Sequence, residues 1–138
     1  MMKQILLGAL VAGFCSTANA ADNFIEGVYL QSEELCAQAK ADSLQTVIEA
    51  GNVILTADGI ESIEYNCEFV RIDKGTRSPA WVVTALCQEP GYLFPDVLSI
   101  VELSATQLDL VSVRPVDPEG GGSANGGSYH LCDGVDAP

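Results

Sequence analysis

Positive charge is scarce in this sequence. Its 138 residues include six lysine and arginine residues against nineteen aspartate and glutamate residues, which gives a formal net charge of −13. A nucleic-acid-binding protein needs a basic face to neutralise phosphates, and so does a protein that docks on an anionic membrane surface. The balance therefore argues against both classes of partner, and it favours a cationic protein instead.

Catalytic motifs are also missing. His130 is the only histidine, so it is the only imidazole available as a general base, and no G-x-S-x-G elbow marks a nucleophilic serine. Glu61, Glu64 and Glu68 are spaced along the outward side of a predicted strand, where nothing in the pattern buries a carboxylate as acid catalysis requires. We therefore expect His130 to lie on a strand face near solvent and the protein not to be an enzyme.

Metal and phosphate motifs are absent as well. The spacings between Cys36, Cys67, Cys87 and Cys132 are 31, 20 and 45 residues, which leaves no C-x₂₋₄-C pair for zinc. Asp117, Glu119 and Asn125 match no calcium-loop spacing. The glycine run 120–122 is followed by the strand-like "SYHLC" and not by a helix, so it does not fit a phosphate loop. We expect no metal and no cofactor.

A long apolar run occurs at the N-terminus. Lys3 precedes an uncharged apolar segment over residues 5–14, and Ala18-Asn19-Ala20 matches a signal-peptidase site. The apolar segment is too short to anchor the chain in a bilayer. We predict a secretory signal peptide over residues 1–20, a single β-rich domain over residues 21–138 and a periplasmic or secreted location.

Cleavage of the leader would leave four cysteines, an even number in an oxidising compartment, which predicts two disulfides. A hairpin with its turn within residues 73–79 and its centre at Arg77 pairs residues whose numbers sum to 154. This register sets Cys67 opposite Cys87, close enough for a bridge. By elimination Cys36 pairs with Cys132. The chain-entropy model credits each bridge with about 3 to 5 kcal/mol.

One short helix is predicted near the start of the domain. After a first strand over residues 24–30, Ser32 is a suitable N-cap, with two glutamates in the first turn where they complement the helix dipole. The helix runs at least to Ala41. It either continues to Ala50, with Gly51 as the residue after its C-cap, or breaks at Asp42-Ser43 and leaves residues 44–48 as a short strand or a second turn.

The rest of the domain reads as antiparallel strands. Residues 60–72 alternate, with Ile63, Tyr65, Cys67 and Phe69 on the inward face. The strands are predicted at residues 24–30, 52–56, 60–72, 81–87, 97–103, 108–113 and 128–132. About seven strands with mostly sequential hairpins predict a mainly β fold, either a small antiparallel barrel or a strongly curved sheet, with the helix closing one end.

Two loops are candidates for partner contacts. Residues 90–95 carry Tyr92 and Phe94, and aromatic side chains on loops are plausible interface anchors. A flexible loop over residues 116–127 carries Asp117 and Glu119, whose charge suits a cationic partner.

The order of Gly27-Val28-Tyr29, the four domain cysteines and a closing "YHLC" at residues 129–132 resembles small secreted proteins of Gram-negative bacteria. The format is also similar to periplasmic lysozyme inhibitors, which are compact, disulfide-bridged β domains that insert a loop into a cationic enzyme. The S-G-x-x-Y signature of several of those families is missing, so no inhibitory residue transfers. We predict a non-enzymatic binding or inhibitor module for a cationic protein such as a cell-wall hydrolase. The alternative is a small-ligand carrier that uses the barrel interior, for which a large apolar cavity would be the deciding observation.

Overall fold

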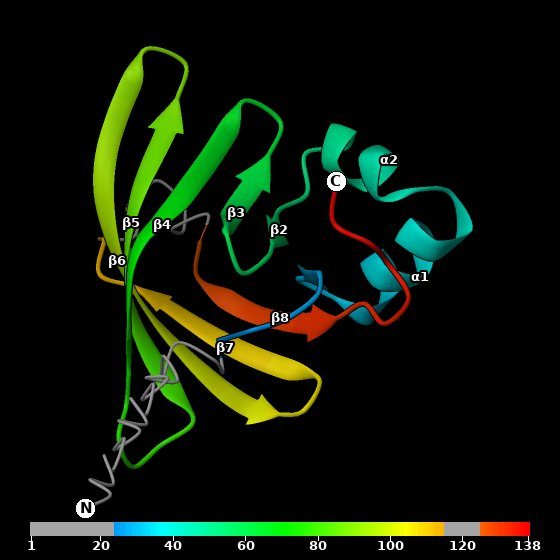
Figure 1. Cartoon of the computed structure of the whole chain (residues 1–138). Coiled ribbons are helices and arrows are strands. Elements are labelled where there is room, and N and C mark those ends of the chain that lie inside the picture. Colours follow the sequence, from blue (N-terminus) through cyan, green and yellow to red (C-terminus); the bar gives the residue numbers. More distant parts are fainter. Residues whose placement is uncertain (1–23, 115–124) are drawn as a thin grey trace, which may run out of the picture.

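The computed structural model, which describes residues 24–114 and 125–138, is a closed antiparallel β-barrel with two short helices on one side (Figure 1). Eight strands follow one another round the barrel in chain order, and the last pairs with the first. They are β1 (Tyr29–Leu30), β2 (Ile54–Leu55), β3 (Gly59–Ser62), β4 (Tyr65–Lys74), β5 (Ala80–Glu89), β6 (Tyr92–Ser104), β7 (Gln107–Ser112) and β8 (Gly127–Leu131). The mainly β fold is confirmed, with eight strands in place of about seven. The predicted signal peptide lies outside the described residues.

Strand alternation fills the interior of the barrel. On β5 the odd-numbered residues 81–87 are buried, while Val82 and Leu86 point outward and are exposed. The same alternation on β6 and β7 turns Leu98, Ile100 and Leu110 inward. Tyr129 from β8 is fully buried among them. The barrel interior is therefore a packed core.

The helices cover the outer face of the barrel at its short strands. Ser32 caps α1 (Glu33–Ala41) by accepting a hydrogen bond from the Leu35 N–H, as predicted. The chain then breaks, and Ser43 caps a second helix, α2 (Leu44–Glu49). Of the two alternatives the break is correct, although the second segment is a helix and not a strand, because Ser43 offers a second cap just after α1 ends.

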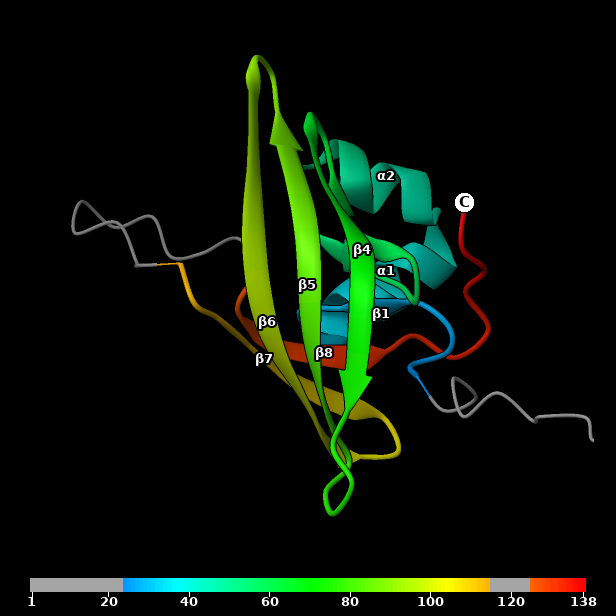
Figure 2. The same cartoon turned by 60° about the vertical axis from the view of Figure 1, so that its left-hand side comes forward.

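A second apolar cluster joins the helices to the barrel. Leu30 and Ile54 turn outward from β1 and β2 and pack with Ala39 of α1 and Val47 of α2. The Cys36–Cys132 disulfide belongs to the same cluster and fastens α1 to the chain just after β8, which confirms the predicted pair. Figure 2 shows both helices on one side of the molecule, behind β4 in that view.

The β4–β5 hairpin has the predicted register at its disulfide end. Cys67 pairs with Cys87 and Phe69 with Ala85, and the two cysteines form the second disulfide. The register then shifts by one residue, because Val70 is an extra residue that forms a bulge between Phe69 and Arg71.

Two predicted segments differ in the structure. The strand expected over residues 60–72 is interrupted at Ile63 and Glu64, which form a tight turn between β3 and β4. Ser62 pairs with Tyr65, and Glu64 takes a φ of 55°. Ile63 is therefore 54% exposed and not inward. The alternation concealed this turn, because Ile63 in the turn is in phase with Tyr65, Cys67 and Phe69 of β4, although the buried Ile60 of β3 is not.

The first strand is shorter than expected, since only Tyr29 and Leu30 of residues 24–30 pair with neighbouring strands. Gly27, with a φ of 89°, lies at the bend that precedes them. At the other end of the chain the predicted final strand is shifted by one residue, to Gly127–Leu131. Most of the predicted flexible loop lies outside the described residues, but Asn125 at its end is buried and Gly127 already belongs to β8.

Candidate functional site

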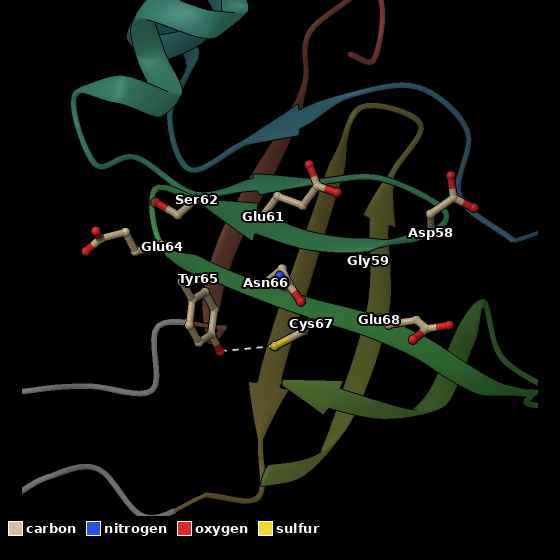
Figure 3. A pocket seen from close by; sticks show the side chains of 9 residues that line it. All are labelled: Asp58, Gly59, Glu61, Ser62, Glu64, Tyr65, Asn66, Cys67 and Glu68. Atoms are coloured by element: carbon tan, nitrogen blue, oxygen red, sulfur yellow. Dashed lines mark hydrogen bonds between the residues drawn. The ribbon is translucent and has the colours of Figure 1, made fainter. Parts of the chain in front are cut away.

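An acidic hollow on the β3–β4 hairpin is the candidate site (Figure 3). It has a volume of about 420 Å³ and opens to solvent. Four exposed carboxylates surround it, and no lysine or arginine is among the residues that line it. The four carboxylate residues are Asp58, Glu61, Glu64 and Glu68. We call these four residues and Gly59 the acidic hollow.

The hairpin geometry gathers these carboxylates. Glu61 on β3 pairs with Asn66 on β4, and Gly59 pairs with Glu68, so Glu61 and Glu68 lie on the same outer face of neighbouring strands. Glu64 projects from the β3–β4 turn. The absence of a side chain at Gly59 allows β3 to approach β4 closely, because a Cβ there would overlap the carbonyl of Cys67. Glycine is therefore required at the floor of the hollow.

The strand register continues this surface toward the β5–β6 hairpin. Asn66 pairs with Gln88, and Gln88 pairs with Leu93, so these residues form one outward-facing row with Glu61. Neighbouring strands are about 4.8 Å apart, which sets Leu93 roughly 15 Å from Glu61. Leu93 is 59% exposed. The acidic hollow and the exposed Leu93 side chain thus lie on the same outer face of the barrel.

The two predicted aromatic contacts have different environments. Tyr92, at the tip of the β5–β6 hairpin, is 58% exposed and remains available to a partner. Phe94 is 6% exposed, so its expected exposure on a loop is wrong: residues 92–95 belong to β6, whose alternation turns Phe94 into the core. The Arg114 guanidinium also covers its ring at 3.6 Å. The proline that suggested a loop, Pro95, lies beyond the end of β7, where no described residue pairs with β6 on that side.

The predicted acidic contacts Asp117 and Glu119 lie outside the described residues. The sequence pattern indicates Glu61, Glu64 and Glu68 only as a possible catalytic set and does not mark them as a binding surface. Their spacing is evident in the sequence, but the turn at residues 63–64, which brings them round one hollow, is not.

A buried polar network lies inside the barrel, next to the Cys67–Cys87 disulfide. Asp96 is 1% exposed and accepts hydrogen bonds from the Ser112 hydroxyl at 2.7 and 2.8 Å and from the Asn125 side-chain amide at 2.8 Å. The Tyr65 hydroxyl in turn donates to the Asn125 side-chain oxygen at 2.7 Å. Burial is the main cause that raises the pKa of the Tyr65 phenol. The network ties β4, β6 and β7 to the start of β8.

His130 lies apart from this network. It is on β8, where it pairs with Leu30 of β1 and Gln107 of β7, and it is partly exposed. Its electrostatic influence falls on Glu34 of α1, whose pKa is lowered mainly by hydrogen bonds from its own backbone and from Ser32 and to a smaller degree by His130. Across residues 24–114 and 125–138, no group of three or more histidine, cysteine, aspartate or glutamate side chains is arranged to hold a metal ion.

The chain matches no known family. No family model, no curated protein and no solved structure is significantly similar to it. Within the part of the chain that the structure describes, no helix is long and apolar enough to cross a membrane. The two disulfides are typical of proteins that mature in an oxidising compartment.

Proposed function

We propose that the protein is a periplasmic or secreted, non-enzymatic binding or inhibitor module that docks a cationic protein such as a cell-wall hydrolase. The observation that supports this most strongly is the acidic hollow, in which four carboxylates surround an open depression that no basic residue lines. The net charge of −13 adds a long-range attraction for any cationic partner. The resemblance in format to periplasmic lysozyme inhibitors points to the same class of partner.

The surface offers two kinds of contact. Exposed carboxylates contribute little affinity individually, and salt screens them, but together they accelerate encounter with a basic protein. Leu93, on the same outward row as Glu61, and Tyr92, at the tip of the β5–β6 hairpin, supply exposed apolar area. Aromatic side chains in particular act as anchors in protein interfaces. We therefore propose that the hollow steers a basic segment and that the hairpin tip fixes it.

The test measures binding and inhibition of a purified hydrolase of the lysozyme class. We expect the association rate to fall steeply as salt rises from roughly 20 to 200 mM, over which the screening length shortens about threefold. The variant Asp58→Asn/Glu61→Gln/Glu64→Gln/Glu68→Gln is expected to lose most of the association rate. A matched control with equal charge loss away from the hollow is Glu49→Gln/Asp109→Asn/Asp133→Asn/Asp136→Asn.

The control variant is expected to keep most of the association rate, because it retains the local field of the hollow. If both variants slow association equally, net charge and not the hollow attracts the partner. If the unaltered protein neither binds nor inhibits the hydrolase at low salt, the proposed partner class is wrong.

The alternative, a small-ligand carrier, has less support. A carrier would need a large apolar cavity, whereas Tyr129, Leu98, Ile100 and their neighbours pack the barrel interior. The acidic hollow and two smaller pockets, one beside Glu26 and Glu102 and one beside Glu89, open at the surface and are lined partly by charged residues. No observation on the described residues favours the carrier over the binding module.

A further inference from the structure

The outer face of β5, β6 and β7 is apolar, although it is not covered by any described helix or strand. In an antiparallel sheet whose outer face meets water, the outward positions are usually polar, as they are at Glu61, Asn66 and Glu68 of β3 and β4. Figure 2 shows β5 and β6 in front, with the helices behind them. The six apolar residues on this side, which we call the apolar face, are Val82, Leu86, Pro95, Val97, Val111 and Val113.

Strand register brings these six residues into three neighbouring rows. The rows across the three strands are Val82–Ser99–Val111, Thr84–Val97–Val113 and Leu86–Pro95. The second row is completed just after β7, where the Val113 N–H donates to the Val97 carbonyl at 3.0 Å. Thr84 and Ser99 are the polar members, and no row contains a charged residue. Four of the six apolar side chains are between 37% and 69% exposed, so the face is open to solvent.

The size of the apolar face matches the centre of a small interface. Three strands about 4.8 Å apart, with five residues of each at about 3.4 Å per residue, span roughly 15 by 17 Å. Contiguous apolar patches beyond a few hundred Å² are uncommon on monomers and mark contact sites. Weak, reversible complexes bury less than about 600 Å² per partner, with an apolar centre and a polar rim. The apolar face is large enough for such a centre and too small for a permanent complex.

The border of the apolar face carries charges of both signs. Glu68, Arg71 and Asp73 flank it on β4, and the last two form an ion pair at 2.7 Å. Arg114 follows the face on the β7 side. These four charges cancel, although the whole chain has a net charge of −13. Four of the five lysines and arginines among the described residues lie on β4, in the β4–β5 turn or just after β7: Arg71, Lys74, Arg77 and Arg114.

This balance of charge distinguishes between occupants of the face. A cationic protein, the partner in the proposed function, is attracted by carboxylates, and this border offers it no net negative charge. Two copies of the acidic chain repel each other at long range, but least where each presents a neutral, apolar surface. A two-fold symmetric contact opposes the border to itself, and a border with both signs is self-complementary.

We propose that the apolar face is the interface of a weak, reversible, two-fold symmetric dimer of this chain. The sheets of the two copies pack face to face about 10 Å apart, so that the valine and leucine side chains leave water. The inference goes beyond the proposed function, because it concerns a second copy and not a hydrolase. None of the six residues of the apolar face belongs to the acidic hollow.

Sedimentation equilibrium of the purified protein between roughly 5 and 500 μM, the range suited to a weak interface of this size, measures the dimer. We expect a monomer–dimer equilibrium without larger species, since a two-fold contact closes at two copies. Raising salt from roughly 20 to 200 mM is expected to strengthen the dimer, because it screens the repulsion between acidic copies. Hydrolase binding is expected to weaken over the same range, so the two proposals fail independently.

Two variants test the face itself. Val82→Lys/Val111→Lys places two charges in one row of the face and is expected to abolish the dimer, although it makes the net charge less negative. Val82→Thr/Val111→Thr keeps the side-chain shape but replaces a methyl with a hydroxyl at each position. It is expected to weaken the dimer by roughly tenfold to a hundredfold, because each substitution acts in both copies. This second variant keeps the test decisive if circular dichroism shows that the lysines disturb the fold.

The matched control is Gln45→Lys/Ile63→Lys, which adds the same two charges at exposed positions on α2 and in the β3–β4 turn. It is expected to keep or strengthen the dimer. The proposal is overturned by a protein that stays monomeric at the highest concentration and salt, which would leave the face to a different partner, or by species larger than a dimer. An undiminished dimer in the folded face variants, or equal weakening by the control, would also overturn it.

Discussion

At the scale of single residues, Asn125 joins the buried side chains that hold β4, β6 and β8 together. Its side-chain amide donates to Asp96 and its side-chain oxygen accepts from Tyr65. The Asn125→Ala variant would leave a buried carboxylate and a half-buried phenol each short of a partner. We expect the free energy of unfolding to fall by about 2 to 4 kcal/mol, as measured by urea denaturation.

Asn66→Ala is the matched control for this substitution. Asn66 is exposed on the outer face of β4, so its loss is expected to cost less than about 0.5 kcal/mol. Equal losses for the two variants would show that the buried network does not contribute to stability in the way its geometry indicates.

Gly59 is a second position where one residue controls the local structure. A Cβ at this position would overlap the Cys67 carbonyl on the paired strand, and backbone cannot move away as a flexible side chain can. We expect Gly59→Ala to lower the free energy of unfolding by about 2 to 3 kcal/mol. For comparison, Gly134→Ala meets no atom within 4 Å and is strained only by its φ of 77°, so about 1 kcal/mol is expected. A milder effect at position 59 than at 134 would contradict the close approach.

At the scale of elements, the Cys36–Cys132 disulfide fastens the helical layer to the barrel. It closes a sequence separation of 96 residues, so the chain-entropy model gives about 3 to 5 kcal/mol. We expect Cys36→Ser/Cys132→Ser to lose stability of this order. The amide protons of α1 are expected to exchange much faster with solvent, while those at the centre of β5 remain the slowest.

The same substitutions at the other disulfide provide the contrast. Cys67→Ser/Cys87→Ser opens a bridge with a sequence separation of 20 residues inside the barrel, so we expect faster exchange in β4 and β5 and little change in α1. If both pairs of substitutions loosened the same elements, the helices would not be held by their own disulfide.

Local signals in the sequence predicted the elements and the strand pairing correctly where each signal was compatible with one structure only. The Ser32 cap, the β4–β5 register at the disulfide and both disulfides are confirmed. The turn at Ile63–Glu64 was missed because Ile63 happens to be in phase with the inward residues of β4. The burial of Phe94 was missed because Pro90 and Pro95 suggested a loop. Pro90 instead lies in the turn before β6, and Pro95 pairs among the described residues with β5 alone.

The candidate site was less predictable than the fold. The expected exposure of Tyr92 is confirmed, but its role as a contact residue stays a prediction. The acidic hollow depends on a tight turn and on a glycine that faces a backbone carbonyl, neither of which has a distinctive local signal. Asp96 and Asn125 are 29 residues apart and meet only because β6 and β8 lie close in the closed barrel. Contacts of this kind follow from barrel closure and not from local pattern.

At the scale of the whole molecule, the negative charge is largely uncompensated. Within the described residues, the one ion pair closer than 4 Å joins Arg71 to Asp73, two residues apart on β4, so it ties no elements together. Four of the exposed carboxylates lie round the hollow of β3 and β4. Packing and disulfides therefore hold the fold, and surface ion pairs contribute little to its stability.

The burial of three tyrosines predicts that alkaline pH destabilises the fold. Burial raises the pKa of Tyr29, Tyr65 and Tyr129 above the ordinary value near 10, because the interior disfavours a phenolate. A group whose pKa is raised on folding contributes stability that is complete below its unfolded pKa and is lost as pH rises through the folded pKa. We therefore expect the free energy of unfolding to be steady between about pH 7 and 9 and to fall above about pH 10.

Urea denaturation across this pH range measures the fall, and phenolate absorbance in native and urea-unfolded protein measures the tyrosine ionisation directly. The native titration is expected to lag behind the unfolded one. The Tyr29→Phe variant removes one of the three phenols and should flatten the loss of stability above pH 10, since phenylalanine cannot ionise. A fall of equal steepness in this variant, or native and unfolded titrations that coincide, would contradict the assignment of alkaline sensitivity to the buried phenols.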